Sequence, residues 1–476
     1  MPFPSDLDPQ SGAATVASTG TRPGMERLAS CLTSLGSLPK RVEQVARICL
    51  LDTLGSGIYG AATPEGQCIL HAVAELSDAN DALIWGTFQR SSTDQAAFVC
   101  GALCHVRELD DVHFAILHTG AVCVPAALAA AQRQACNLGH VLRAITLGVE
   151  AIVRVSLGMD YLSHRRRGWH ATATCGAFGA AAAASSILGL GEQALADAMG
   201  ISGSRTGGSW AFSVDNAMSK RLHPGLAARD GVLSAYLAAR GITGPHYVLE
   251  APDGGFYQAY SDSWDMEQLD RPNERYAMED VEYKWFASCK SVHSPHSAAL
   301  LIRKEHPELK PEDIRRVTVE VNSSAFSMAS KMYEHDSVIS AQLSIPYGIA
   351  LGLYGRQGDA KDYEPAALAD GRFIGLAGKV RVVESEEMNR LRKAELKSGA
   401  RLRVEWRNGQ SAEAAVTAPK GSMTNPLSQD DVIKKFSGLT ERILGKNKTA
   451  AVTEMVLNGS VSSPVAELCA LLTPIQ

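Results

Sequence analysis

Residues 171–191 (ATATCGAFGAAAAASSILGLG) form a long uncharged run in this chain, and small side chains make up most of it. A run of this length could cross a bilayer. Alanine, glycine, serine and threonine carry little transfer free energy, however, so the run favours a tightly packed buried helix over a membrane span. The surrounding chain must then supply other helices that approach this one closely.

Apolar residues recur at helical spacing from about residue 25 to residue 260. Residues 139–159 and 225–245 show this pattern, and glycine and proline separate the predicted helices. In residues 40–60, one stripe of a predicted helix consists of Val42, Val45, Ala46, Cys49 and Leu50.

Near residue 281 the pattern changes to one typical of strands. Residues 379–385 read as a strand, and in two further segments apolar side chains alternate, as a half-buried strand requires: Val317, Val319 and Val321, then Leu402, Val404 and Trp406. Asn408-Gly409 predicts a type I′ turn into a returning strand. Helix resumes near Ser428, which we expect to be an N-cap.

These patterns predict a mainly α fold. A large all-helical domain combines residues 25–280 with residues 428–476, and a smaller inserted α/β domain takes residues 281–427. The length of 476 residues agrees with two domains, because single cores stop growing well below that size. Residues 1–24 are rich in Pro, Ser, Gly and Thr and lack the features of a signal peptide, so we expect a disordered tail.

Composition excludes several classes of function. The net charge of −5 and the absence of a dense basic run argue against a nucleic-acid partner. Ten scattered cysteines without a C-x-x-C pair favour a reducing cytosol over a disulfide framework and make an iron–sulfur cluster improbable. The sequence also lacks the glycine-rich nucleotide loops and the G-x-S-x-G elbow of serine hydrolases.

Titratable residues concentrate in residues 108–120 (ELDDVHFAILHTG), although the flanking segments are apolar and small. Asp110 and His113 could share a helix face, whereas His113 and His118 would diverge on one helix. We therefore predict a helix end that runs into a loop, with His118 before a second helix starting near Pro125. A solvated helix terminus is the alternative.

Two further segments place basic residues at predicted helix starts. His170 directly precedes the apolar helix, whose N-terminus disfavours imidazolium and so favours the neutral imidazole that a general base requires. Lys220 and His223 precede Pro224-Gly225, and a lysine there could bind a carboxylate as a point charge. The alternatives are a capping histidine and a surface lysine.

Residues 284–296 (KWFASCKSVHSPH) lie at the predicted domain boundary and concentrate polar side chains: Lys284, Cys289, Lys290, His293 and His296. His293 and His296 alone make a weak metal motif, because Pro295 lies between them and no partner motif accompanies them. Tyr347 follows in an apolar segment, where a core tyrosine is the default interpretation.

Taken together and in order, these segments resemble the MmgE/PrpD family, which includes 2-methylcitrate dehydratases, cis-aconitate decarboxylases and iminodisuccinate epimerases. The likeness extends along nearly the whole chain after the tail. Its motifs include LDTLGSGIYG, ELDDVH…LHTGAVCVPA, GWHATATCGAFGAAAAASSILGL, KRLHPGLAARDG, KWFASCKSVH and AQLSIPYGIA.

The resemblance implies a helical domain with an α/β lid, an active site in the cleft between them, a homodimer and, for the decarboxylases, no metal or organic cofactor. Carried over residue by residue, it leads us to expect four catalytic residues: His118, His170, Tyr347 and Asp110. We expect the substrate to be bound by Lys220, Lys284, Asp111, His113, His223, Cys289 and His293. Cys289 stands where some members have histidine.

The reactions of this family act on small di- or tricarboxylates through a carbanion or enolate beside a carboxylate. Lysines would offset the charge of such a substrate, and histidines would move a proton at carbon. We therefore predict a cytoplasmic, cofactor-independent lyase that dehydrates or decarboxylates a small polycarboxylate, with no metal site and no membrane partner. The alternatives are an epimerase or isomerase that exchanges a proton at carbon, and a non-catalytic carboxylate-binding protein.

Overall fold

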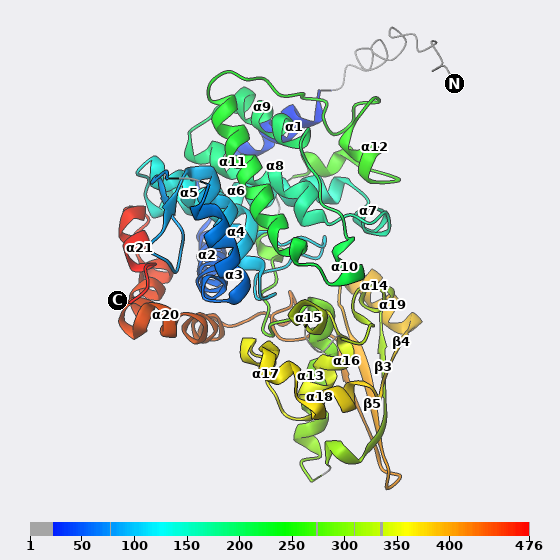
Figure 1. The fold of residues 1–476 in the computed structure, drawn as a ribbon. Coiled ribbons are helices and arrows are strands. Elements are labelled where there is room, and N and C mark those ends of the chain that lie inside the picture. The colour runs from blue at the N-terminus through cyan, green and yellow to red at the C-terminus, as the bar shows by residue number, and fades with distance from the viewer. Residues whose placement is uncertain (1–21, 77, 273–274, 309, 334–336, 476) are drawn as a thin grey trace, which may run out of the picture.

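The computed structural model describes residues 22–475 except 77, 273–274, 309 and 334–336 (Figure 1). The predicted disordered tail therefore falls almost wholly outside the described residues. The first helix begins at Gly24, whose N–H donates to the Glu250 side chain at 2.7 Å.

Helices from both ends of the sequence build the larger part of the molecule, in which the C-terminal helices lie beside the N-terminal ones (Figure 1). A small hairpin of β1 (Ala82–Leu83) and β2 (Arg90–Ser91) interrupts the predicted all-helical pattern. The helices are α1 (Gly24–Ser34), α2 (Lys40–Ala61), α3 (Pro64–Ala74), α4 (Thr93–His105), α5 (Gly120–Arg133), α6 (Leu138–Gly158), α7 (Tyr161–Arg166), α8 (Ala171–Ile187), α9 (Glu192–Gly203), α10 (Phe212–Asp215), η2 (Met218–Leu222), α11 (His223–Ala238), α12 (Phe256–Tyr260), η3 (Met266–Leu269), η4 (Ala277–Asp280), α20 (Gln429–Asn458) and α21 (Val465–Leu471).

The uncharged run forms α8, which is buried along nearly its whole length. Small residues let neighbouring helices approach it: a Cβ added at Gly179 would lie 2.8 Å from the carbonyl oxygen of Gly148 on α6. A Cβ added at Gly231 on α11 would lie 2.4 Å from Cβ of Ala180. Across the described residues, no helix combines the length and the apolar character needed to span a membrane.

The smaller part contains a four-stranded sheet in the order β4-β3-β5-β6, in which only β3 and β4 are parallel. Its hydrophobic cluster is separate from that of the larger part, although Leu109 and Leu439 of the larger part join it. The predicted fold class, mainly α with a smaller α/β insertion, is thus confirmed. Its elements are α13 (Lys290–Glu305), η5 (Pro311–Asp313), β3 (Ile314–Val321), α14 (Ser323–Ala329), α15 (Val338–Gln342), α16 (Ile345–Leu353), η6 (Ala360–Tyr363), α17 (Pro365–Leu368), α18 (Gly371–Ala377), β4 (Val380–Glu384), α19 (Glu386–Glu395), β5 (Ala400–Trp406) and β6 (Ser411–Val416).

The hairpin between β5 and β6 differs from the predicted one in its turn. A type I′ turn needs positive φ at both central residues, whereas only Gly409, with φ of 87°, has it; Asn408 does not. Trp406 N–H bonds to Gln410 C=O at 2.9 Å, which encloses three residues. The loop is therefore a three-residue hairpin loop with a left-handed glycine, and the predicted turn type is wrong.

The close contact between α8 and α6 predicts that Gly179→Ala destabilises the fold. The added methyl group must push two helix backbones apart, which costs about 1–3 kcal/mol. Chemical denaturation should show a lower midpoint for this variant. Gly375→Ala is the matched control, because Gly375 lies within α18 with nothing near its added Cβ, and alanine there should stabilise by up to about 1 kcal/mol. Equal effects of the two substitutions would contradict the role given to close packing.

Candidate active site

Residues 106–119 connect α4 to α5 and contain no helix. Two of them, Glu108 and Ile116, have φ of 51° and 60°, in the left-handed region that non-glycine residues rarely adopt. Such a backbone costs about 1–3 kcal/mol and persists only where its surroundings fix it. The loop must therefore be held by other parts of the molecule.

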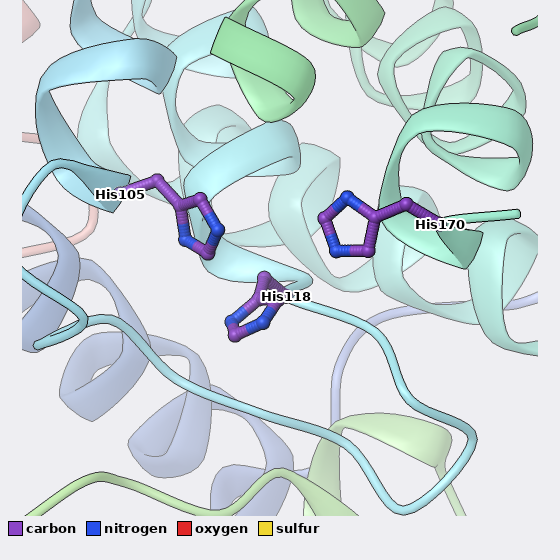
Figure 2. A group of neighbouring side chains, drawn as sticks. All are labelled: His105, His118 and His170. Carbon is purple, nitrogen blue, oxygen red and sulfur yellow. The ribbon is translucent and has the colours of Figure 1, made fainter. Parts of the chain in front are cut away.

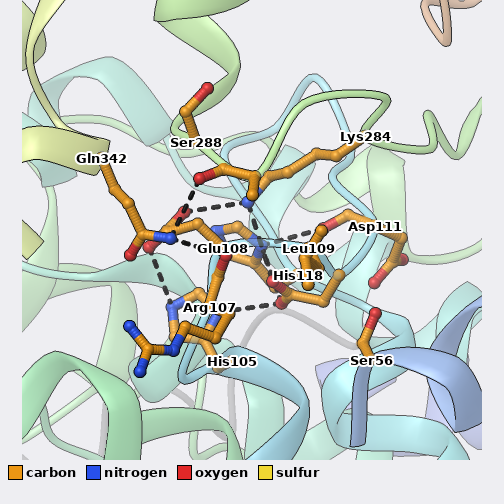
Figure 3. Close-up of polar contacts among 12 residues, drawn as sticks. Ser56, His105, Arg107, Glu108, Leu109, Asp111, His118, Lys284, Ser288 and Gln342 are labelled. Carbon is orange, nitrogen blue, oxygen red and sulfur yellow. Dashed lines mark hydrogen bonds and ion pairs between the residues drawn. The ribbon is translucent and has the colours of Figure 1, made fainter. Parts of the chain in front are cut away.

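Three distant segments hold this loop. Lys435 of α20 donates to Leu109 C=O at 2.6 Å, and Gln342 of α15 donates to Arg107 C=O at 2.7 Å (Figure 3). The backbone of Glu282 makes two hydrogen bonds of 2.8 Å with the same loop. Both parts of the molecule thus fix the loop.

Asp111 anchors the end of the loop to the next helix. Its carboxylate accepts hydrogen bonds from the Thr119 hydroxyl at 2.5 Å and from Gly120 N–H at 2.9 Å. Burial raises the pKa of Asp111 to about 6, although these hydrogen bonds oppose the shift. Helix α5 therefore starts at Gly120 and not near Pro125, as was predicted. Asp111, which was predicted to bind substrate, instead accepts hydrogen bonds at the start of this helix.

A cavity of about 760 Å³, open to solvent, lies between the larger and the smaller part. Helix starts, the 106–119 loop and the segment entering the smaller part all contribute to its wall. Its charged or titratable side chains include Glu108, His118, His170, Lys220, Lys284 and Arg392. Four of these six were predicted from sequence to converge, and they do.

Glu108 is buried in this wall between two lysines. Lys220 of η2 donates to its Oε1. Lys284 donates to its Oε2 at 2.8 Å (Figure 3). Burial acts to raise the pKa of Glu108, but the two lysines outweigh it and hold that pKa well below the usual range. Burial likewise acts to lower the pKa of Lys284, and Glu108 and Asp110 outweigh it and raise that pKa. Glu108 and Lys284 are therefore charged, and a ligand carboxylate must share the lysines with Glu108.

Asp110 lies between two imidazoles. Its Oδ2 is 2.8 Å from Nδ1 of His105 and 3.1 Å from Nδ1 of His118, which is also 2.8 Å from the Asp111 carbonyl oxygen. A carbonyl oxygen only accepts, so Nδ1 of His118 bears a proton and Nε2 is its basic nitrogen. Asp110, predicted to be catalytic, lies outside the cavity wall and orients His118.

His170 is the N-cap residue of α8, as the sequence predicted. Its Nδ1 lies 2.8 Å from Nδ1 of His223, so His223 orients His170 from outside the cavity wall instead of making the predicted substrate contact. Burial, and then the neighbouring His223 and Lys220, lower the pKa of His170 well below 6.5. Burial lowers the pKa of His223 to about 4. Both imidazoles are therefore neutral near pH 7.

The rings of His105, His118 and His170 converge (Figure 2). Their centroids are 4.4 Å apart for His105 and His118 and 6.1 Å apart for His118 and His170, and each ring offers a nitrogen within 4.8 Å of the others. Three imidazoles could hold a metal ion by ligand type. The ammonium groups of Lys220 and Lys284 adjoin the same cavity, however, and they repel a cation and attract an anion. The same wall includes Arg392, which has no carboxylate at ion-pair distance among the described residues, and its charge also favours an anionic ligand.

Two predicted site residues lie in the interior of the smaller part. Tyr347, predicted to be catalytic, is fully buried and donates its hydroxyl to Asp362 C=O at 2.8 Å, and burial raises its pKa. His293, predicted to bind substrate, is buried on α13 with Nε2 3.3 Å from Ser288 C=O. Neither lines the cavity. Their environments are those of core residues, and we assign them no contact with a ligand.

His113 and Cys289 do line the cavity, as the substrate-binding prediction requires. Nδ1 of His113 accepts from Ala115 N–H at 3.2 Å, and burial lowers the pKa of His113 to about 3. Cys289 is the N-cap residue of α13 and is half-buried. Both stay candidates for ligand contact.

Three residues of the site, His105, Glu108 and Arg392, were not predicted. His105 is the last residue of α4 and is buried behind Asp110, with Nε2 3.8 Å from Oε1 of Glu108. The available signal was that imidazoles flank the acidic run on both sides, at positions 105, 113 and 118. A buried acidic run needs such partners on both sides.

Comparisons with known proteins agree with this arrangement. A model of the MmgE/PrpD N-terminal domain matches residues 27–269, and a model of the MmgE/PrpD C-terminal domain matches residues 286–459. The chain belongs to the MmgE/PrpD family. The predicted family membership is therefore confirmed.

Several members of the MmgE/PrpD family are similar to this chain over most of its length. The cis-aconitate decarboxylase-like protein oryM of Aspergillus oryzae is 28% identical over 460 residues, covering 92% of this chain and 94% of that protein. The cis-aconitate decarboxylase of Aspergillus terreus is 26% identical, covering 91% and 92%. The human cis-aconitate decarboxylase is 29% identical over 330 residues, covering 65% and 66%.

Because Lys220 and Lys284 share the Glu108 carboxylate, we predict that Glu108→Gln lowers the free energy of unfolding by about 3–5 kcal/mol. The two buried ammonium groups lose their main counter-ion in this variant. The folded-state pKa of Glu108 is lowered, so its contribution is present above the ordinary value of 4.5 and is lost as the pH falls through the lowered value. Denaturation of both proteins between pH 7 and pH 3 should show the difference shrinking toward acid.

The control for this substitution is Glu413→Gln. The side chain of Glu413 is 56% exposed and pairs with Arg403 at 3.5 Å, an ion pair worth about 0–1 kcal/mol. A loss for Glu108→Gln no larger than for this control would contradict the proposed electrostatic role of Glu108.

Proposed function

We propose that this protein is a lyase that decarboxylates a small tricarboxylate of the cis-aconitate type. The observation that supports this most directly is the joining of Lys220, Lys284, His118 and His170 in one cavity. A polycarboxylate needs cations to bind it, and a carbanion needs an acid to protonate it. The names of the similar proteins support decarboxylation over the other reactions of the family.

Charge stabilisation is the first part of the proposed mechanism. When carbon dioxide leaves, the electron pair of the broken C–C bond remains on the substrate carbon and spreads into the neighbouring double bond and carboxylate. Lys220 and Lys284 are already fixed beside Glu108, so they can stabilise this charge without reorganising. The proposed chemistry needs no cofactor as electron sink, because the conjugated carboxylate fills that role.

Proton delivery is the second part. Nδ1–H of His118 donates to the Asp111 carbonyl oxygen and lies 3.1 Å from Oδ2 of Asp110, so Nε2 is the nitrogen available for proton transfer. His170 is neutral and its pKa is lowered, so it suits a base or a neutral hydrogen-bonding group. We infer that His118 delivers the proton to carbon and that His170 orients the substrate. The C–COO⁻ bond is broken, carbon dioxide is released, and a new C–H bond forms with the consumption of one proton.

Incubation with cis-aconitate in deuterated water should test the reaction class. Decarboxylation predicts release of one carbon dioxide and one deuteron fixed at carbon in each product molecule, both measured by NMR. 2-Methylcitrate and iminodisuccinate serve as parallel substrates. Loss of water from 2-methylcitrate, or exchange of deuterium without carbon dioxide, would replace the proposal with a dehydratase or an epimerase. Binding of every acid without turnover would indicate a carboxylate-binding protein.

The proton-transfer role predicts that His118→Asn lowers kcat by about 10²- to 10⁴-fold and leaves the melting temperature nearly unchanged. The asparagine amide can donate to the Asp111 carbonyl oxygen, as Nδ1 of His118 does, but it cannot transfer a proton. His71→Asn, an exposed position on α3, is the control and should retain full activity. Wild-type kcat for His118→Asn would remove the assignment. The homodimer implied by the resemblance and the cytoplasmic location indicated by the cysteines stay predictions.

A further inference from the structure

Arg392 is a half-buried residue in the last turn of α19, in the smaller part, and it lines the cavity. One nitrogen donates to Leu396 C=O at 2.8 Å, at the end of its own helix. Another donates to Phe114 C=O at 3.1 Å, in the 106–119 loop that also contains His118. Figure 1 shows α19 at the end of the smaller part that faces the larger one.

The other cations of the cavity wall have carboxylate partners. Lys220 and Lys284 share Glu108, and Lys290 lies 3.3 Å from Oε2 of Glu282. Within the described part of the chain, Arg392 has no carboxylate at ion-pair distance, and its two hydrogen bonds go to carbonyl oxygens. A guanidinium has five N–H groups and is always ionised, so Arg392 presents an uncompensated charge and free donors.

A second feature adds positive potential on the same side. Helix α13 is 16 residues long and begins at Lys290, and its first residues line the cavity together with Arg392. The N-terminus of a helix has a partial positive charge that favours an anion. The side of the cavity formed by the smaller part thus attracts a carboxylate independently of the two lysines around Glu108.

We propose that Arg392 is the specificity-determining residue of this cavity and binds the carboxylate of a tricarboxylate that Lys220 and Lys284 leave free. This inference rests on the proposed function and extends it to the number of carboxylates recognised. The planar guanidinium can bind a carboxylate through two parallel hydrogen bonds. A dicarboxylate held by the two lysines has no group for Arg392, so the enzyme discriminates against it.

The experiment compares binding of two unreactive acids by calorimetry. Tricarballylate has three carboxylates and glutarate has two, and neither has a double bond to stabilise a carbanion. Arg392→Gln should weaken tricarballylate binding about 10- to 100-fold, the usual range for a lost hydrogen bond to a charged group. Glutarate binding should change less than about threefold. Arg392→Lys keeps the positive charge but loses the planar pair of N–H donors. Its affinity for tricarballylate should therefore lie between those of the wild type and Arg392→Gln.

The matched control is Arg390→Gln, on the same helix but exposed and outside the cavity wall. It should bind both acids as the wild type does. Equal tricarballylate affinity for Arg392→Gln and wild type would overturn the inference, and so would equal losses for the two acids, which would indicate a general role in joining the two parts. Kinetics with cis-aconitate should show a raised KM with a smaller change in kcat.

The result separates this inference from the proposed function. If the wild type neither binds tricarballylate nor converts cis-aconitate, the proposed function fails. If it does both and Arg392→Gln behaves like the wild type, only the role of Arg392 fails. If Arg392→Gln does not fold, Arg392→Lys decides: unchanged discrimination between the two acids would overturn the inference, and reduced discrimination would support it.

Discussion

The ion pairs of Glu108 with Lys220 and Lys284 are the interaction on which the site depends. The two lysines are 64 positions apart in the sequence. Without Glu108, their ammonium groups would be buried beside each other with no anion to share. The backbone of Glu108 adopts the left-handed conformation where its side chain contacts both lysines. The hydrogen bonds that hold the 106–119 loop, such as that from Gln342 to Arg107 C=O, stabilise this conformation. The protein therefore forms its anion site around an anion of its own, and Lys284 remains charged before any ligand arrives.

Close helix packing fixes the positions of the histidines. Gly101 on α4 and Gly225 on α11 are in direct backbone contact, since a Cβ added at Gly101 would lie 2.8 Å from Cα of Gly225. The end of α4 and the start of α11 consequently lie close together, with His105 at the first and His223 at the second. The small residues of these helices therefore contribute to the site, because they set the distance between the helix ends that bear the imidazoles.

The sequence could predict the parts of the site that depend on local signals. The place of His170 at a helix start follows from the local pattern. The convergence of His118, His170, Lys220 and Lys284 on one cavity was implied by the family resemblance instead. Tyr347 and His293 show the limit, because a matching motif does not reveal whether a side chain faces a cavity or a core. Asp111 could be assigned only by locating the start of α5, which the prediction placed five residues too late. The turn type predicted for the β5–β6 loop was wrong for a similar reason, because a loop that is longer by one residue adopts a different turn.

The 106–119 loop also links the site to the arrangement of the two parts. Gln342 and Arg392 of the smaller part donate to its backbone, and Leu109 within it belongs to the hydrophobic cluster of the smaller part. From the larger part, Lys435 donates to the same loop. Any relative movement of the two parts therefore acts on the backbone of Glu108 and His118. A movement that widened the cavity would therefore also shift the backbone that places Glu108 between the two lysines.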